Sequence, residues 1–151
     1  MSLFNSMNIS ASGLTAQQIR MDTISQNIAN VQTTRTPEGG PYKRKTVIFQ
    51  EIDDRDPFSF IFTDAIRRGQ KPTWQGSGVR VTKIVNDNSP GSLMYDPSHP
   101  DADEEGYVRM PNINIIEEMV NMISASRSYE ANITAINSSK AMIAKTLELG
   151  R

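Results

Sequence analysis

The chain has 151 residues, a formal net charge of -1, no cysteine and a single histidine, His99. This length suffices for one domain with a core, and the missing thiols exclude a disulfide framework, a thiolate zinc site and a cysteine nucleophile. Because the charge is balanced and no apolar run reaches the roughly 18 residues that span a bilayer, we expect neither nucleic-acid binding nor membrane insertion.

The first 31 residues have the pattern of an amphipathic helix with an unusual polar face. Met7, Leu14, Met21 and Ile28 repeat every seven residues, as a and d positions do in a coiled coil. The opposite face carries mainly uncharged Asn, Ser, Thr and Gln, although a solvated helix normally carries charges there. We therefore expect this helix to pack against protein on most sides and to be marginal in isolation.

Residues 32–110 form a middle segment that holds nearly all the prolines and most of the aromatics. Alternating apolar residues predict strands in 57–64 and 78–85, and 45–52 and 107–110 are weaker candidates. Turn-forming stretches rich in glycine and proline separate these segments. We expect a small β-rich insert with long loops.

Residues 115–149 are predicted to form one long helix. Asn114 is a suitable N-cap, two glutamates follow in the first turn, and Gly150 supplies a C-terminal stop. At 1.5 Å per residue the helix would be about 52 Å long, whereas a compact domain of this size has a diameter of roughly 38 Å. Either the helix breaks or the molecule is elongated, and the lack of proline and internal glycine favours elongation.

The predicted fold class is α+β, in which long N- and C-terminal helices form a coiled-coil-like domain with a small β-rich insert between them. Its expected parts are the N-terminal helix in 1–31, the insert in 32–110 and the C-terminal helix in 111–151. A helix pair in the core of an ordinary monomer is the simpler alternative. The scarcity of charge in the first helix argues against that alternative.

An acidic segment, "DPSHPDADEEG" at 96–106, is the best candidate for a metal site. Its possible ligands are Asp96, His99, Asp101, Asp103, Glu104 and Glu105. The spacing is similar to the opening of a calcium loop, but Asn112 stands where a bidentate glutamate is needed. A solvated acidic connector is the simpler interpretation. A non-enzymatic adaptor or calcium-responsive binding module remains the alternative function.

No arrangement typical of catalysis is present. Basic clusters at 43–45 and 67–71 could contact phosphates, but nearby acids favour solvated or intersubunit ion pairs. The sequence contains no phosphate-binding glycine loop, no nucleophile elbow and no metal-binding helix motif. We expect no enzymatic activity, no cofactor and no metal.

Two asparagines end the first helical pattern in the stretch "NIANVQTTRT". Asn30 can be explained as a C-terminal cap, whereas Asn27 has no such local explanation, and unpaired buried amides are costly. We expect Asn27 to form hydrogen bonds to neighbouring helices in an assembly. On this hypothesis Asn27→Leu leaves the subunit folded and impairs assembly.

The segment "SGLTAQQIRMDTISQNIANVQTT" resembles the N-terminal signature of the axial proteins of the bacterial flagellum, which form its rod and hook. The C-terminal segment, from "YVRMPNINIIEEMVNM" to "SSKAMIAKTLELGR", is similar to the same family. The departure "TTRTPEGGPYKRK" and the short insert resemble a proximal rod subunit. The likeness covers about residues 5–50 and 105–151.

The resemblance implies a structural subunit of the proximal rod, the drive shaft of the flagellar basal body. Such subunits assemble helically through their terminal helices, transmit torque and line the export channel. The implied partners are like subunits, other flagellar rod proteins and the flagellar type III export apparatus. The implied location is the periplasmic rod, reached without a cleaved signal peptide.

The expected assembly interface follows the apolar stripes of both helices and includes the two asparagines. It comprises Met7, Leu14, Met21, Ile24, Asn27, Ile28, Asn30, Met119, Met122, Tyr129, Ile133, Ile136, Ile143 and Leu147.

Overall fold

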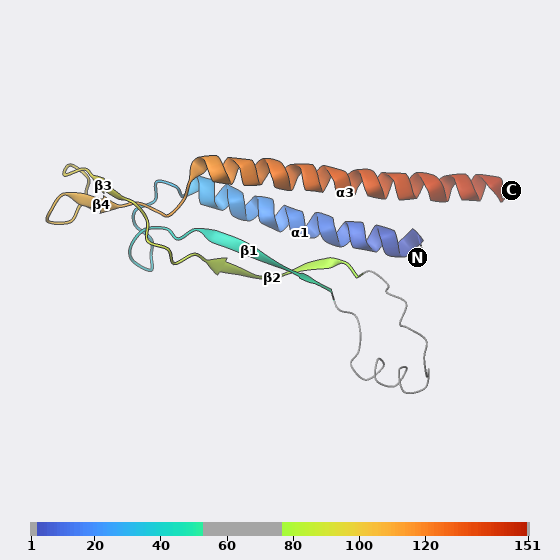
Figure 1. Cartoon of the computed structure of the whole chain (residues 1–151), viewed down its shortest axis with the longest axis horizontal. Helices are drawn as coiled ribbons and strands as arrows, with labels where there is room; N and C mark the ends of the chain where they lie inside the picture. The colour runs from blue at the N-terminus through green and yellow to red at the C-terminus, as the bar shows by residue number, and fades with distance from the viewer. Residues whose placement is uncertain (1–2, 53–76, 151) are drawn as a thin grey trace, which may run out of the picture.

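A computed structural model describes residues 3–52 and 77–150 of the chain (Figure 1). Two long helices enclose the sequence of four strands, as the α+β prediction requires. In chain order the elements are α1 (Leu3–Ala29), β1 (Lys45–Glu51), β2 (Val79–Asn86), β3 (Leu93–Tyr95), β4 (Tyr107–Arg109) and α3 (Ile115–Leu149). The strand predicted at 57–64 lies outside the described residues.

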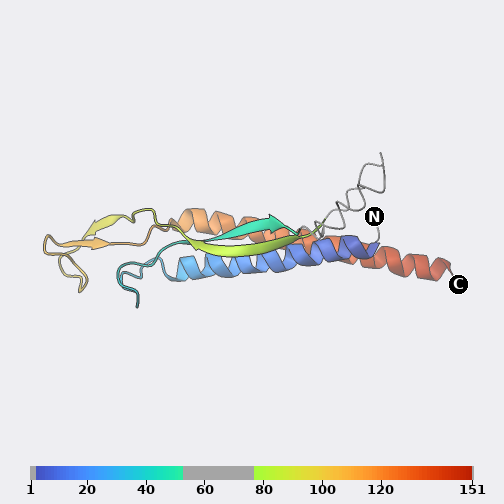
Figure 2. The same cartoon turned by 90° about the horizontal axis from the view of Figure 1, so that it is seen from below.

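The two helices lie side by side in antiparallel directions along the long axis of the molecule (Figures 1 and 2). Asn27 of α1 contacts Glu118 of α3, and Gly13 faces Asn132. Both contacts lie 14 residues apart along each helix, which is two heptads, so one register holds over this length. Because α3 has 35 residues and α1 has 27, the C-terminal turns of α3 extend beyond the start of α1 (Figure 2).

The prediction of one unbroken C-terminal helix is confirmed. Asn114 caps it through a side chain that accepts a hydrogen bond from Ile116 N at 3.0 Å, which satisfies one of the free N–H groups of the first turn. The helix ends at Gly150, as predicted. However, this glycine has φ -88° rather than a left-handed conformation, so its special freedom is not used.

Strands β1 and β2 form an antiparallel ribbon that packs along α1 (Figure 1). Val79 and Val81 are half-buried while Arg80 and Thr82 are exposed, which confirms the predicted alternation of β2. A bulge follows Ile48, where the register shifts by one residue.

Strands β3 and β4 form a second antiparallel pair. It lies beyond the end of the helix pair at which α1 ends and α3 begins (Figure 1). The weak strand prediction at 107–110 is confirmed by β4, whereas β3 was not predicted. The loop between them ends at Gly106, whose φ of +80° is a conformation that L side chains rarely adopt.

The apolar core of the described residues is small because the molecule is elongated. Its buried members are Ala16, Ile24, Val108 and Ala125. Many large apolar side chains remain exposed, especially on α3. In the described part of the chain, neither helix has an apolar run long enough to cross a membrane.

Candidate assembly interface

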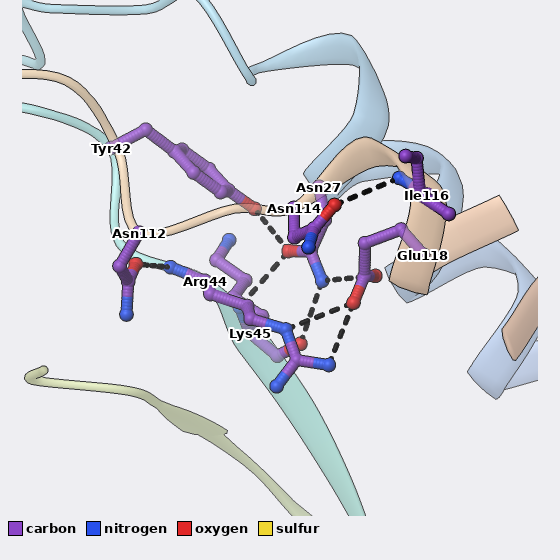
Figure 3. A network of polar contacts seen from close by, with 8 residues as sticks. All are labelled: Asn27, Tyr42, Arg44, Lys45, Asn112, Asn114, Ile116 and Glu118. Carbon is purple, nitrogen blue, oxygen red and sulfur yellow. Dashed lines mark hydrogen bonds and ion pairs between the residues drawn. The ribbon is translucent and has the colours of Figure 1, made fainter. Parts of the chain in front are cut away.

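Asn27 is the centre of a polar network that joins the end of α1, the start of β1 and the start of α3 (Figure 3). Its amide nitrogen donates to Lys45 O at 2.9 Å and to Glu118 Oε2 at 3.0 Å. Its amide oxygen accepts from Lys45 N at 2.9 Å and from Tyr42 Oη at 3.2 Å. All four hydrogen-bonding positions of the amide are therefore filled.

The pair of bonds to Lys45 makes the Asn27 amide act as a strand neighbour for the first residue of β1. A peptide group in an adjacent strand would likewise donate to the carbonyl and accept from the N–H of the same residue. Since Asn27 is 1% exposed, water cannot replace these bonds. This side chain fixes where the ribbon begins on the helix.

Glu118 is a carboxylate buried at 1% exposure in the first turn of α3. Arg44 donates from Nε at 2.9 Å and from Nη2 at 2.6 Å, both to Oε1, while Asn27 binds Oε2. A buried charge is tolerated only with such partners. In the first of the predicted basic clusters, at 43–45, Arg44 thus forms an ion pair within the chain. The second cluster, at 67–71, lies outside the described residues.

Asn112 completes the network, which we call the clasp and whose side chains belong to Asn27, Tyr42, Arg44, Asn112 and Glu118. Asn112 Oδ1 accepts from Arg44 N at 3.0 Å. Burial and the charge of Glu118 raise the pKa of Tyr42, because both disfavour the phenolate. The clasp thus joins both helices to the ribbon.

The clasp corrects the hypothesis made for Asn27. Its partners all belong to the same chain, so a leucine at this position would remove four hydrogen bonds inside the subunit. The amide is thus not reserved for a neighbouring helix, and we now expect Asn27→Leu to destabilise the subunit itself. Asn30 follows the simpler interpretation: its side chain donates to Gln26 O at 2.8 Å and accepts from Thr33 Oγ1 at 3.2 Å, capping the end of α1 locally.

The apolar members of the expected interface fall into two groups. The larger group is buried or half-buried within the chain and comprises Met7, Leu14, Met21, Ile24, Ile28, Met122, Tyr129, Ile136 and Ile143. Met119, Ile133 and Leu147 are exposed. Most of the stripe residues are thus covered within the chain, where α1 packs against both α3 and the β1–β2 ribbon, and only part of the stripes remains free for other contacts.

A second apolar stripe lies on the outer face of α3. Ile116, Met119, Val120 and Ile123 are all exposed, and their spacing places them on one side of the helix, away from the Glu118 and Ala125 positions that are buried. The set predicted from sequence contained only Met119 of these four. The i, i+3, i+4, i+7 spacing carries the signal for the others.

The acidic segment does not form a calcium loop in the structure. Asp96 Oδ1 accepts from Ser98 N and Oγ, which lowers the pKa of Asp96. Asp101 accepts from Thr34 Oγ1 at 2.8 Å, and His99 Nδ1 accepts from Asp101 N. Within 3–52 and 77–150, no three acids or histidines gather closely enough to hold a metal ion.

Comparison with known proteins matches both helical ends of the chain. The family model described as "Flagella basal body rod protein" matches residues 7–35, and the model "Flagellar basal body rod FlgEFG protein C-terminal" matches residues 104–149. The chain is 51% identical to the flagellar basal-body rod protein FlgC of Borreliella burgdorferi, covering 99% of this chain and 98% of that protein. It is 46% identical to FlgC of Bacillus subtilis and 38% identical to FlgC of Escherichia coli O157:H7, over the full length of both.

The chain belongs to the FlgC family of flagellar basal-body rod proteins. It is a structural rod subunit of the flagellar basal body. The two matched segments cover most of α1 and all of α3, the two helices that the clasp joins, and Asn27 lies in the first match and Glu118 in the second. The FlgC relatives also cover the middle of the chain, which neither family model matches.

Proposed function

We propose that this subunit assembles helically through its terminal helices into the periplasmic proximal rod, where it transmits torque and lines the export channel. It reaches that site through the flagellar type III export apparatus without a cleaved signal peptide. Like subunits and other rod proteins are its partners, and it has no catalytic role.

The observation that carries helical assembly is the unfinished seam between the helices. In the register set by Asn27 with Glu118 and Gly13 with Asn132, the position opposite Leu147 falls before the start of α1, and Leu147 is 70% exposed. A seam that continues without a partner is suited to a helix from another subunit.

The outer stripe of α3 adds a second apolar surface at the other end of the helix. Ile116 is 74% exposed there. Because this stripe and the C-terminal seam differ in residues and lie at opposite ends of α3, contact between them joins unlike surfaces. Contacts between unlike surfaces produce open helical arrays when they do not close into a ring.

The test is polymerisation of the purified chain, followed by sedimentation and by electron microscopy. We expect filaments, alone or with another rod protein, and their loss in Leu147→Asp. Ser138→Asp is the matched control, since Ser138 is exposed on the same helix and away from the seam. A chain that stays monomeric under every condition, or filaments unaffected by Leu147→Asp, would contradict assembly through the seam.

A further inference from the structure

The β3–β4 tip is an apolar surface with an acidic edge. Its strands expose Leu93, Met94, Tyr95 and Tyr107, and Tyr95 is 64% exposed although its ring meets that of Tyr107 edge to face. The adjoining loop carries Glu104 and Glu105, both exposed. Neither glutamate has an ion-pair partner among the described residues.

A groove of about 580 Å³ lies between the 36–43 loop and the end of β2. Its apolar lining includes Pro37, Pro41, Tyr42 and Ile84, the last of which is half exposed. Its cations are Lys43 and Lys45, and its acid is Glu38.

The lysines of this groove contact neutral groups. Lys43 donates to the neutral Asn88 Oδ1 at 3.1 Å, and Lys45 Nζ lies 5.6 Å from the centre of the Tyr42 ring. No carboxylate of the described residues forms an ion pair with either lysine. The groove therefore combines apolar walls with positive charge.

The tip is held on its own chain by contacts at its base. Thr34 Oγ1 donates to Asp101 Oδ2 at 2.8 Å, and Met110 N donates to Ser92 O at 2.9 Å. These contacts leave the exposed side chains of Tyr95 and Glu104 uncovered. The first contact ties the loop of the tip to the segment after α1, and the second extends the pairing of β3 with β4.

We propose that the β3–β4 tip of one subunit docks into the Lys43–Lys45 groove of a second copy of this chain. Apolar strands then meet apolar walls, while Glu104 and Glu105 pair with Lys43 and Lys45. The two surfaces are different, so the contact is heterologous and adds a link between inserts to the helix contacts. This inference rests on the proposed self-assembly, but it names an interface outside the terminal helices.

Crosslinking tests the contact directly because the chain has no cysteine of its own. Glu104→Cys and Lys43→Cys variants are mixed and treated with a short bis-maleimide. We expect a crosslinked dimer in the mixture and little in either variant alone, with circular dichroism confirming that both fold. The control replaces Lys43→Cys with Ser138→Cys, and an equal yield from this pair would overturn the proposal.

Charge reversal provides the second measurement. Here the tip cysteine is placed at Asp103→Cys, and this chain is crosslinked to the Lys43→Cys chain. Adding Glu104→Lys and Glu105→Lys to the Asp103→Cys chain should lower the yield of crosslinked dimer at least threefold. Raising the salt from about 0.05 M to about 0.5 M should lower the yield of the unreversed pair by a similar factor. Adding Lys45→Glu to the Lys43→Cys chain should restore much of the lost yield.

The outcomes separate this inference from the proposed function. Filaments without the crosslink would overturn the tip-to-groove contact and leave assembly through the helices intact. A specific, salt-sensitive crosslink without filaments would support the contact and count against helical assembly. A crosslink that neither salt nor charge reversal weakens would overturn the recognition proposed here.

Discussion

The side-chain amide of Asn27 lies 3.0 Å from the carboxylate of Glu118, although 91 residues separate them in the chain. Both side chains are almost completely buried. Their contact joins the end of one terminal helix to the start of the other, and Arg44 and Lys45 bring the ribbon to the same point (Figure 3). The geometry of the subunit at this point therefore depends on two buried polar side chains whose hydrogen bonds water cannot replace.

Asn27→Leu should destabilise the isolated subunit by about 3 kcal/mol, because it leaves buried polar groups of Lys45 without partners. Urea unfolding followed by circular dichroism measures this change. Asn30→Leu is the matched control, and its loss should stay below about 1 kcal/mol since Asn30 only caps its own helix. Equal losses in the two variants would contradict the role given to the clasp.

Arg44→Ala should cost about 2–3 kcal/mol, because it strands the buried charge of Glu118. Arg44 keeps 28% of its side chain exposed, so water compensates part of the loss. Replacing both residues in Arg44→Met/Glu118→Met removes the stranded charge and should recover part of the stability, because the buried Asn27 amide then loses one acceptor. A double variant less stable than Arg44→Ala would contradict this explanation, because the loss in Arg44→Ala would then not come from the stranded charge of Glu118.

Tyr42 should make the subunit sensitive to alkaline pH. Its pKa is raised in the folded state above the ordinary value of 10.0, so the folded chain holds its proton more tightly than the unfolded chain does. Stability is then fully present below about pH 10 and falls as the pH rises through the folded pKa. Unfolding experiments across this range should show a smaller loss in Tyr42→Phe, which also costs about 1 kcal/mol at neutral pH. Identical alkaline slopes would contradict this prediction.

Gly13 should limit how closely the two helices approach. A Cβ at this position would lie 3.0 Å from Asn132 Nδ2, so Gly13→Leu should cost about 1–3 kcal/mol through overpacking. Gly13→Ala combined with Asn132→Ala removes the clash and gains helix propensity, about 1 kcal/mol at position 13. Thermal unfolding distinguishes the two variants, and a tolerated leucine would show that the helices can separate here without cost.

Calcium should leave the melting temperature of the subunit unchanged. The carboxylates of Asp96 and Asp101 face Ser98 and Thr34 rather than a common centre. Calorimetric titration with calcium should therefore show no heat of binding. A raised melting temperature would instead restore the calcium-responsive module as a candidate.

Local patterns in the sequence were sufficient to predict the elements with strong periodicity. The heptad spacing, Asn114 and the length of α3 predicted an unbroken helix and an elongated molecule. The alternation from Val79 to Thr82 predicted the two faces of β2. Strand β3 was missed because its three residues, in a short stretch between Gly91 and Pro97, carry too short a pattern.

The clasp could not be predicted from local patterns. Glu118 has the features of a glutamate that favours the positive end of a helix, and only the fold brings Arg44 to it. The same holds for Asn27, whose four partners come from Tyr42, Lys45 and Glu118. Sequence spacing does not predict contacts between residues so far apart in the chain. The sequence therefore suggested hydrogen bonds from this amide to a neighbouring subunit.

The clasp also sets an order of events for a chain that emerges from its N-terminus. Residues 27, 42, 44 and 45 come first, but the carboxylate that completes their network is residue 118. Until residue 118 is present, Arg44 lacks its acceptor and α1 lacks its antiparallel neighbour. The clasp can therefore form only after most of the sequence is available.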